Sequence, residues 1–277
     1  MNDTTFKGFF LRKYPRYAYI YKVIENAAGN ALQWSDLTDP NIDLIADNIR
    51  NNVAPNTART YLALFKSLLN KAKMSGIEFP AKRFTELLKC RPNKVVRAYL
   101  SIEELKKIQN YTPQNSNEAY VRALFLIGAY TGARQSDFKR LDRANITDDG
   151  FLSYVSEKTQ VRAFIPLKPI VKELLNDIPK TRLPLPTFNN IIRRICRNAG
   201  IITRVKVLKG GREYEGEKWR FVSSHTARIS FCSNLFAAGC DVVSLAKMAG
   251  HSDINMTKRY IACNTLNLPK KALKYFS

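Results

Sequence analysis

Residues 117–137 read NEAYVRALFLIGAYTGARQSD, and this stretch decides how the second part of the chain folds. Apolar side chains cover most sides of its first part, so we expect a helix over Asn117–Thr131 at the centre of a core. The helix ends at Gly132. Arg134 follows at once, and Asp137 lies three residues further on, where a carboxylate can orient a guanidinium. The pattern predicts a buried, oriented arginine beside a core helix.

The composition points to a globular protein with a polyanionic partner. The chain has 277 residues, a length that suits one large or two ordinary domains. Of these residues 45% are hydrophobic and 11% aromatic, so the chain can bury a core, and this composition excludes a mainly disordered protein. A formal net charge of +22 favours a nucleic acid as partner. The first 22 residues contain no uninterrupted apolar run, and nowhere do about 18 apolar residues follow one another, so we expect neither secretion nor membrane spanning. We therefore expect a cytoplasmic protein with no membrane association.

Metal and cofactor sites are not expected. The five cysteines are scattered and never stand in Cys-x-x-Cys spacing, so we interpret them as reduced thiols. Two histidines are too few for a histidine-based metal site unless carboxylates complete it. We predict that the protein needs neither a metal nor a cofactor.

The first part of the chain shows helical periodicity, which predicts a small helical domain over residues 1–90. Pro55 and Asn56 interrupt the pattern before its longest helix. Residues 91–98 are basic and lack periodicity, so we place the linker there, with a second domain and its tail over residues 99–277. The helices expected in the first domain are Phe9–Asn26, Asn41–Asn52, Thr57–Ser75 and a short stretch at Phe84–Lys89.

The second domain combines helices with short hairpins. Ser101 and Glu104 form a capping box at its start. The apolar period falls to two over Phe151–Leu167, which predicts a β-hairpin, and a second hairpin is expected in Val205–Phe221 around a Gly-Gly turn. The fold class is therefore mainly α with small β-hairpins. Further helices are expected at Ile170–Asp177, Thr187–Ala199, Ser224–Ala238, Asp241–Ala249 and Asn255–Tyr260.

Several groups that can bind phosphate or transfer protons lie in this second domain. His225 and Arg228 are one turn apart at the start of a helix, where the backbone already favours an anion. Taken singly, Arg134 is more often a solvated cation, His225 a helix-end histidine and Tyr260 a core aromatic. His225 and Arg228 together describe a phosphate pocket.

The order of these groups resembles the tyrosine recombinase (phage integrase) family. The likeness spans roughly residues 95–270, with a weaker likeness in the helical front. It implies a two-domain clamp: a helical, SAM-like core-binding domain and a mixed α/β catalytic domain. The matching segments are Thr131-Gly-Ala-Arg134-Gln-Ser-Asp137, Glu157-Lys158-Thr159, His225-Thr-Ala-Arg228 and Ala249-Gly-His251-Ser-Asp-Ile-Asn-Met-Thr257-Lys-Arg-Tyr260.

The resemblance implies a site-specific DNA recombinase that cuts and rejoins strands without metal or ATP. Tyr260 would attack a phosphodiester and form a 3′-phosphotyrosyl bond. Arg134 and Arg228 would hold the phosphate oxygens and stabilise the transition state.

The resemblance also implies proton transfer and support at the same phosphate. Lys158 would protonate the leaving 5′-oxygen, and His225 would assist proton transfer at the nucleophile. His251 would hydrogen-bond the phosphate, and Asp137 would support Arg134.

This sequence departs from the family pattern at two places. Ile229 stands where a second histidine is common, and Ala249 stands where leucine usually precedes Gly-His. Neither position carries a chemical role. The assignment of Lys158 leaves Arg162 and Lys168 open as alternatives, because the length of this hairpin varies in the family.

Double-stranded DNA is the expected partner, held in a clamp and recombined by a homotetramer on two sites, even where the free chain is monomeric. Helix residues of the front domain could read bases, although phosphate contacts are the commoner role. The tail, residues 264–277, packs in cis or docks on a neighbouring protomer. Whether a further arm-binding domain precedes this sequence stays open. The residues expected to contact DNA are Arg59, Lys66, Arg91, Lys94 and Arg97.

Three other functions fit parts of the pattern. A type IB topoisomerase-like enzyme would use the same side chains to relax DNA. A basic DNA-binding protein with vestigial catalytic residues would share the charge. A metallonuclease would need a carboxylate cluster, and the sequence shows none.

Overall fold

The computed structural model describes residues 5–93, 95–179 and 181–261. The chain forms two compact units. The first takes in Met1–Val95 with Leu208–Arg212, and the second takes in Val96–Val207 and Glu213–Ser277. Their assignment as a core-binding domain over residues 1–90 and a catalytic domain over residues 99–277, joined at 91–98, stays a prediction.

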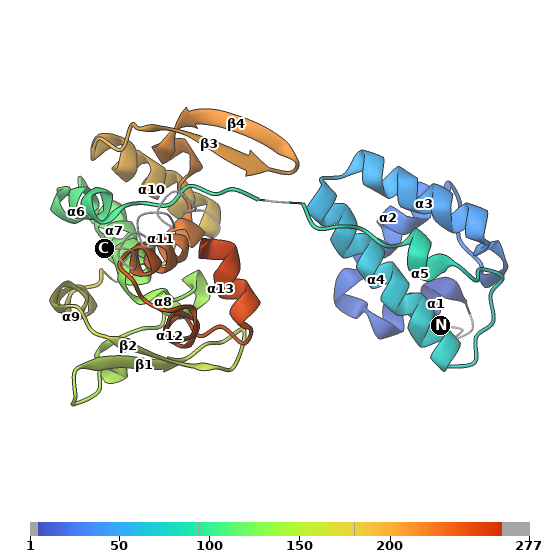
Figure 1. The fold of residues 1–277 in the computed structure, drawn as a ribbon, viewed down its shortest axis with the longest axis horizontal. Coiled ribbons are helices and arrows are strands. Elements are labelled where there is room, and N and C mark those ends of the chain that lie inside the picture. The colour runs from blue at the N-terminus through green and yellow to red at the C-terminus, as the bar shows by residue number, and fades with distance from the viewer. Residues whose placement is uncertain (1–4, 94, 180, 262–277) are drawn as a thin grey trace, which may run out of the picture. The chain divides into compact units, whose positions relative to one another are not determined.

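The first unit is helical (Figure 1). Phe6 lies fully buried in its core and packs edge-on against Phe65 and Trp34, with ring centroids 6.1 and 5.2 Å apart. Its helices are α1 (Phe6–Lys13), α2 (Ala18–Ala28), α3 (Asp39–Asn52), α4 (Pro55–Met74) and α5 (Phe84–Leu87), with 3-10 turns at Pro15–Tyr17 and Trp34–Asp36.

Two expectations for this unit were wrong. The single helix expected over Phe9–Asn26 is two helices, because Tyr14 leaves helical geometry (φ −138°) and Pro15 has no N–H to continue the ladder. Pro55 does not precede the longest helix but begins it, in the first helical position, where a missing N–H costs nothing.

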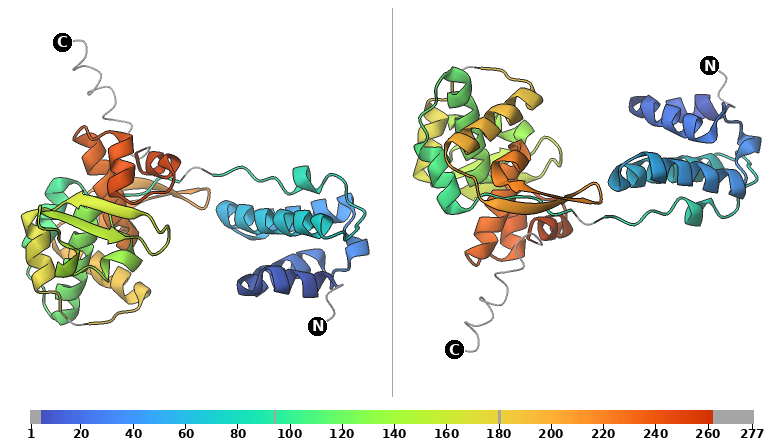
Figure 2. Two further views of the ribbon diagram at one scale, coloured as in Figure 1. Left: turned by 90° about the horizontal axis from the view of Figure 1, so that it is seen from below. Right: turned by 90° about the horizontal axis from the view of Figure 1, so that it is seen from above.

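The second unit holds the remaining helices, the first hairpin and all of the second hairpin except its tip, Leu208–Arg212 (Figures 1 and 2). Its helices are α6 (Ile102–Asn110), α7 (Ser116–Thr131), α8 (Gln135–Phe138), α9 (Pro169–Asn176), α10 (Leu185–Asn198), α11 (Ser224–Ala237), α12 (Val242–Met248) and α13 (Ile254–Ile261), with 3-10 turns at Arg143–Asn145 and Lys218–Phe221. The capping box predicted at the start of α6 is confirmed: Ser101 N–H donates to the Glu104 carboxylate at 2.8 Å, and Glu104 N–H to Ser101 Oγ at 3.3 Å.

Helix α7 is central to this unit, as predicted, and packs against α6, α9, α10 and α11. A Cβ at Gly128 would lie 2.7 Å from the Phe138 ring, so only glycine allows this close packing. The helix ends at Gly132, which has a left-handed φ of 70°.

Both predicted hairpins are confirmed. Strands β1 (Phe151–Val155) and β2 (Arg162–Pro166) pair antiparallel, and Leu152 and Tyr154 face the core. Strands β3 (Arg204–Lys209) and β4 (Arg212–Glu217) form the second hairpin, with both turn glycines at positive φ. The fold is mainly helical with small antiparallel hairpins. None of the helices described here is long and apolar enough to cross a membrane.

Candidate active site

The predicted catalytic residues come from four stretches of the second unit. The turn after α7 carries Arg134, and the loop between β1 and β2 carries Lys158. The first turns of α11 carry His225 and Arg228. His251 follows α12, and Tyr260 lies in α13.

Arg228 is 1% exposed, although it carries a charge. Its Nη1 donates to the carbonyl of Gly132 at 2.7 Å, whereas its Nε and Nη2 are buried and have no hydrogen-bond partner in the structure as described. A buried guanidinium with two unused donor groups is costly to the free protein. It is therefore prepared to bind an anion.

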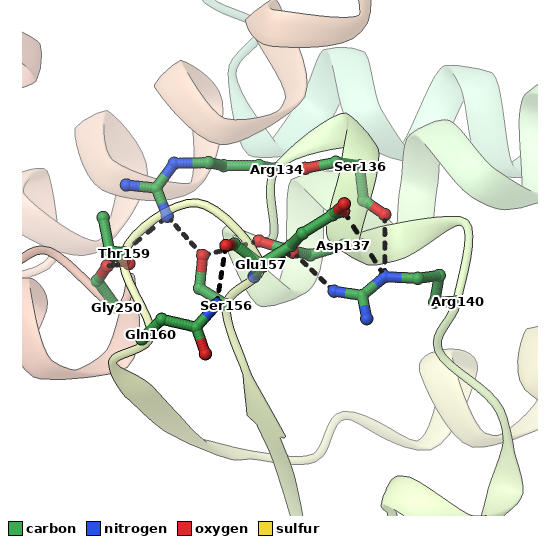
Figure 3. Close-up of polar contacts among 9 residues, drawn as sticks. All are labelled: Arg134, Ser136, Asp137, Arg140, Ser156, Glu157, Thr159, Gln160 and Gly250. Carbon is green, nitrogen blue, oxygen red and sulfur yellow. Dashed lines mark hydrogen bonds and ion pairs between the residues drawn. The ribbon is translucent and has the colours of Figure 1, made fainter.

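Arg134 is half-buried and points toward the β1–β2 loop (Figure 3). Its Nη1 donates to Ser156 Oγ at 2.8 Å and to the carbonyl of Gly250 at 3.4 Å, and its buried Nη2 has no partner among the described residues. Burial, and then the nearby charge of Arg228, lower the pKa of Arg134. The two arginines thus repel each other in the absence of an anion.

His251 is buried and neutral near pH 7. Desolvation, and then the charges of Arg228 and Arg134, lower its pKa to about 3. Its Nδ1 lies 2.7 Å from Thr257 Oγ1, and its Nε2 is buried without a partner in the described chain. When the Thr257 hydroxyl donates to Nδ1, the ring proton lies on Nε2, where it can be donated to an anion.

Tyr260 lies between the two histidines. Its ring stacks on that of His251, with centroids 5.4 Å apart and planes inclined by 8°, and its hydroxyl is 3.4 Å from Nε2 of His225. His225 is exposed. Desolvation is the largest cause that lowers the pKa of His225, to about 4, and four cations add to it: Arg97, Arg228, Arg134 and Lys158.

Lys158 is exposed at the tip of the β1–β2 loop and forms no hydrogen bond or ion pair with the residues that the structure describes. The two alternatives to it are engaged elsewhere. Arg162 Nη1 donates to Ser153 Oγ at 3.2 Å, and Lys168 Nζ lies 4.9 Å from the centre of the Tyr130 ring.

The helical spacing suggested that Asp137 contacts Arg134 directly. This expectation was wrong: no hydrogen bond or ion pair joins the two side chains in the described structure. Arg134 is the extended residue before α8 (φ −70°, ψ 159°), so the one-turn relationship does not apply. Asp137 is 1% exposed and accepts from Ser156 Oγ, from the Glu157 N–H and from Arg140 Nη2, at 2.9, 2.9 and 3.0 Å (Figure 3). Among the described residues, the hydrogen-bonded link from Asp137 to Arg134 runs through Ser156.

Sequence reasoning missed Ser156, Thr159 and the Gly250 carbonyl. Thr159 Oγ1 donates to that carbonyl at 3.2 Å, which ties the β1–β2 loop to the residue before His251 (Figure 3). One signal was available: after Leu152 and Tyr154, the next inward position of the alternating strand is a small polar residue, Ser156.

The residues predicted to contact DNA divide between the units. Arg59 is exposed and Lys66 partly exposed, both on α4 of the first unit, and Arg91 is exposed beyond α5. Lys94 and the tail over residues 264–277 lie outside the described residues. Arg97 belongs to the second unit, close enough to His225 to lower its pKa.

The segment that carries Arg97 is fixed on α11. The Leu100 N–H donates to Ser230 Oγ and its carbonyl accepts from Asn234 Nδ2, both at 2.9 Å.

Among the described residues, no three His, Cys, Asp or Glu side chains gather in a group that could hold a metal ion.

Two tyrosine recombinases are similar in sequence to part of this chain. Tyrosine recombinase XerD of Rickettsia bellii (strain RML369-C) is 25% identical over 195 residues, which cover 64% of this chain and 63% of that protein. Tyrosine recombinase XerD of Rickettsia conorii (strain ATCC VR-613 / Malish 7) is 34% identical over 80 residues, 28% of this chain and 26% of that protein. The chain thus matches less than two thirds of the length of these relatives.

Solved structures share the fold. A Tn1549 transposon integrase fragment in complex with transposon right end DNA has a TM-score of 0.70 at 12% identity and covers 98% of this chain and 99% of that one. A lambda integrase fragment, solved as a dimer bound to a COC′ core site, has a TM-score of 0.66 at 18% identity, covering 92% and 89%. The profile described as the phage integrase family matches residues 98–266, more than half of the chain. This protein therefore belongs to the phage integrase family, the tyrosine recombinases.

Proposed function

We propose that this chain is a site-specific DNA recombinase that cuts and rejoins strands through a covalent bond between DNA and Tyr260. One observation carries the proposal: a set of buried polar atoms beside Tyr260 has no partner in the part of the chain described, namely Arg134 Nη2, Arg228 Nε, Arg228 Nη2 and His251 Nε2. A phosphodiester supplies the negative charge and the acceptor oxygens that these groups lack.

The two arginines bind the non-bridging oxygens of that phosphate. During attack by a hydroxyl, the phosphorus gains a fifth oxygen and the equatorial oxygens gain negative charge. Arg134 and Arg228 are already in place to stabilise this charge, and His251 adds a neutral donor. Groups held in advance need no reorganisation when the reaction occurs.

Tyr260 is the nucleophile. Its hydroxyl oxygen attacks phosphorus, and the bond from phosphorus to the 5′-oxygen breaks. The phenolic proton passes to Nε2 of His225, which lies 3.4 Å away. A bound phosphate cancels part of the positive charge that lowers the pKa of His225, so this nitrogen becomes a better base when DNA is present.

Lys158 donates a proton to the leaving 5′-oxygen. It is exposed on the β1–β2 loop and forms no hydrogen bond or ion pair with the described residues, so it can approach a phosphate that lies over Arg134. The product is a 3′-phosphotyrosyl bond and a free 5′-hydroxyl. Attack by a second 5′-hydroxyl reverses the steps and rejoins the strands, so neither a metal ion nor ATP is required.

Both units take part in holding double-stranded DNA. The first unit acts as the core-binding domain and the second as the catalytic domain, joined at residues 91–98, and together they close around the duplex. The net charge of +22 supports this arrangement. Arg59, Lys66, Arg91, Lys94 and Arg97 contact phosphates.

Strand exchange joins two DNA sites, each of which must be cut twice. We therefore propose that four copies assemble on two sites, including any copies that are monomeric in solution. Because its substrate is the DNA of a bacterium or of a mobile element, the enzyme works in the cytoplasm.

The test is to trap the covalent intermediate. Wild-type and Tyr260→Phe proteins are incubated with EDTA on nicked duplexes that tile the DNA flanking the gene, and each sample is denatured. We expect a protein–DNA adduct with the wild type and none with the variant. Specific binding without any adduct would contradict the proposal.

A second assay separates recombination from topoisomerase activity. A supercoiled plasmid that carries two copies of the cleaved site is incubated with the wild type, and the junctions are sequenced. We expect junctions that exchange the flanks of the two sites. Relaxation without exchanged junctions would assign the enzyme to the topoisomerase class instead.

A further inference from the structure

Ser156 lies at the base of the β1–β2 loop, between the charged side chains of Arg134 and Asp137. It is 0% exposed. Its hydroxyl oxygen is 2.8 Å from Nη1 of Arg134 and 2.9 Å from Oδ2 of Asp137 (Figure 3). No other side chain that the structure describes is hydrogen-bonded to both Arg134 and Asp137.

The chemistry of the three groups fixes the direction of both hydrogen bonds. A guanidinium only donates and a carboxylate only accepts. Ser156 must therefore accept from Arg134 and give its own proton to Asp137. The hydroxyl separates a cation from an anion and satisfies both: its oxygen accepts from Arg134, and its one proton goes to Asp137.

The backbone of Ser156 closes the loop that carries Lys158. Its N–H donates to the carbonyl of Val161 at 3.0 Å, and its carbonyl accepts from the Gln160 N–H at 2.8 Å. The Glu157 N–H donates to Asp137 at 2.9 Å. These backbone hydrogen bonds at the base of the hairpin fix the position of Ser156, and with it the position of its hydroxyl.

We propose that Ser156 is a positioning residue that keeps the Arg134 guanidinium on the scissile phosphate by keeping it off Asp137. Without the hydroxyl, Asp137 has a free acceptor and Arg134 a free donor in a buried place, where opposite charges attract strongly. The two would pair directly, and the guanidinium would turn away from the substrate. This inference rests on the proposed recombinase function.

The test uses a matched pair of variants. Ser156→Thr and Ser156→Val have the same shape and differ only in the hydroxyl, so any steric cost of the added methyl group is shared. Ser156→Ala removes the hydroxyl without adding volume and replaces the valine variant if that one fails to fold. Thermal unfolding checks each fold, and cleavage is measured in a single turnover on saturated nicked duplex.

We expect Ser156→Val and Ser156→Ala to cleave about 10-fold to 100-fold more slowly than the wild type, since positioning groups contribute less than the group they position. Ser156→Thr should stay within a few-fold of the wild type, and the Kd for the duplex should change little in all three. Equal cleavage rates for the threonine and valine variants would overturn the proposal.

A sulfur substrate identifies which residue Ser156 acts through. A duplex with sulfur in place of the leaving 5′-oxygen does not need an acid, so it should rescue Lys158→Ala. It should not rescue Ser156→Val, because that variant lacks a well-placed Arg134. Full rescue of both would show that Ser156 acts through the loop alone and would overturn the proposal.

The failures of the two proposals are distinct. If the wild type forms no adduct, the recombinase function fails. If the wild type forms an adduct and the threonine and valine variants cleave alike, only the role of Ser156 fails.

Discussion

Arg228 Nη1 donates a 2.7 Å hydrogen bond to the carbonyl of Gly132, which lies 96 residues earlier in the chain. Gly132 ends the core helix α7, and Arg134 follows two residues later. The same left-handed turn therefore anchors one arginine of the candidate site and directs the other. The end of the core helix thus brings the two cations together.

Replacing Gly132 should damage both the fold and the site. Gly132→Ala combines a φ of +70° with a Cβ 2.5 Å from the Phe231 ring, so we expect the free energy of unfolding to fall by about 2–4 kcal/mol. Gly150→Ala is the control, because its φ is +80° but no described atom beyond its chain neighbours lies within 4 Å of the added Cβ. It should cost about 1 kcal/mol. Equal losses in denaturant titrations would refute the role of the Phe231 contact.

Arg228 should cost stability in the free protein. Replacing it by methionine removes a buried charge with two donor groups that have no partner among the described residues. Arg228→Met should therefore raise the free energy of unfolding by about 1 kcal/mol or more while abolishing cleavage. Arg194→Met is the control: Arg194 Nε donates at 2.8 Å to Glu118, which is buried, so this change should lower stability. A loss of stability in both variants would argue against a preformed anion site at Arg228.

The two histidines should make the fold sensitive to acid. Their pKa values are lowered from 6.5 to about 4 for His225 and to about 3 for His251. Between pH 6.5 and the lowered pKa values of the folded state, the unfolded chain binds more protons than the folded one. The contribution of the two histidines to the free energy of unfolding is therefore fully present above pH 6.5 and is lost as the pH falls toward the folded pKa values. The unfolding temperature should fall from about pH 7 to about pH 5, and fall less in His251→Asn. Identical slopes would contradict the buried, neutral state of His251.

Thr257 should fix the tautomer of His251. Its hydroxyl lies 2.7 Å from Nδ1 and is fully buried, so Thr257→Val leaves that nitrogen unpaired and lets the proton leave Nε2. We expect single-turnover cleavage about 10-fold to 100-fold slower, with Thr257→Ser close to the wild type. A serine variant as slow as the valine variant would mean that packing, not the hydroxyl, matters.

Local patterns predicted most of the elements. Helix α7, the capping box at Ser101 and both hairpins follow from periodicity and turn chemistry, which act over a few residues. The errors came from prolines whose position decides between a break and a start, at Pro15 and Pro55. Each proline is compatible with local rules, but those rules allow a proline either to interrupt a helix or to begin one.

The site could be predicted only in part. The motifs gave the residues with chemical roles, and the structure brings His225 and His251 to Tyr260. The supports were missed because they depend on tertiary contacts: Arg134 meets the Gly250 carbonyl across 116 residues. A carbonyl or a single serine carries no signal until the fold brings it there.

The identity of the residue that bonds to DNA tests the account most directly. The adduct formed by the wild type is digested with protease and nuclease, and the modified peptide is sequenced by mass spectrometry. We predict that Tyr260 carries a nucleotide linked through its 3′-phosphate. A different modified residue, or a linkage through a 5′-phosphate, would contradict the proposed chemistry of this site.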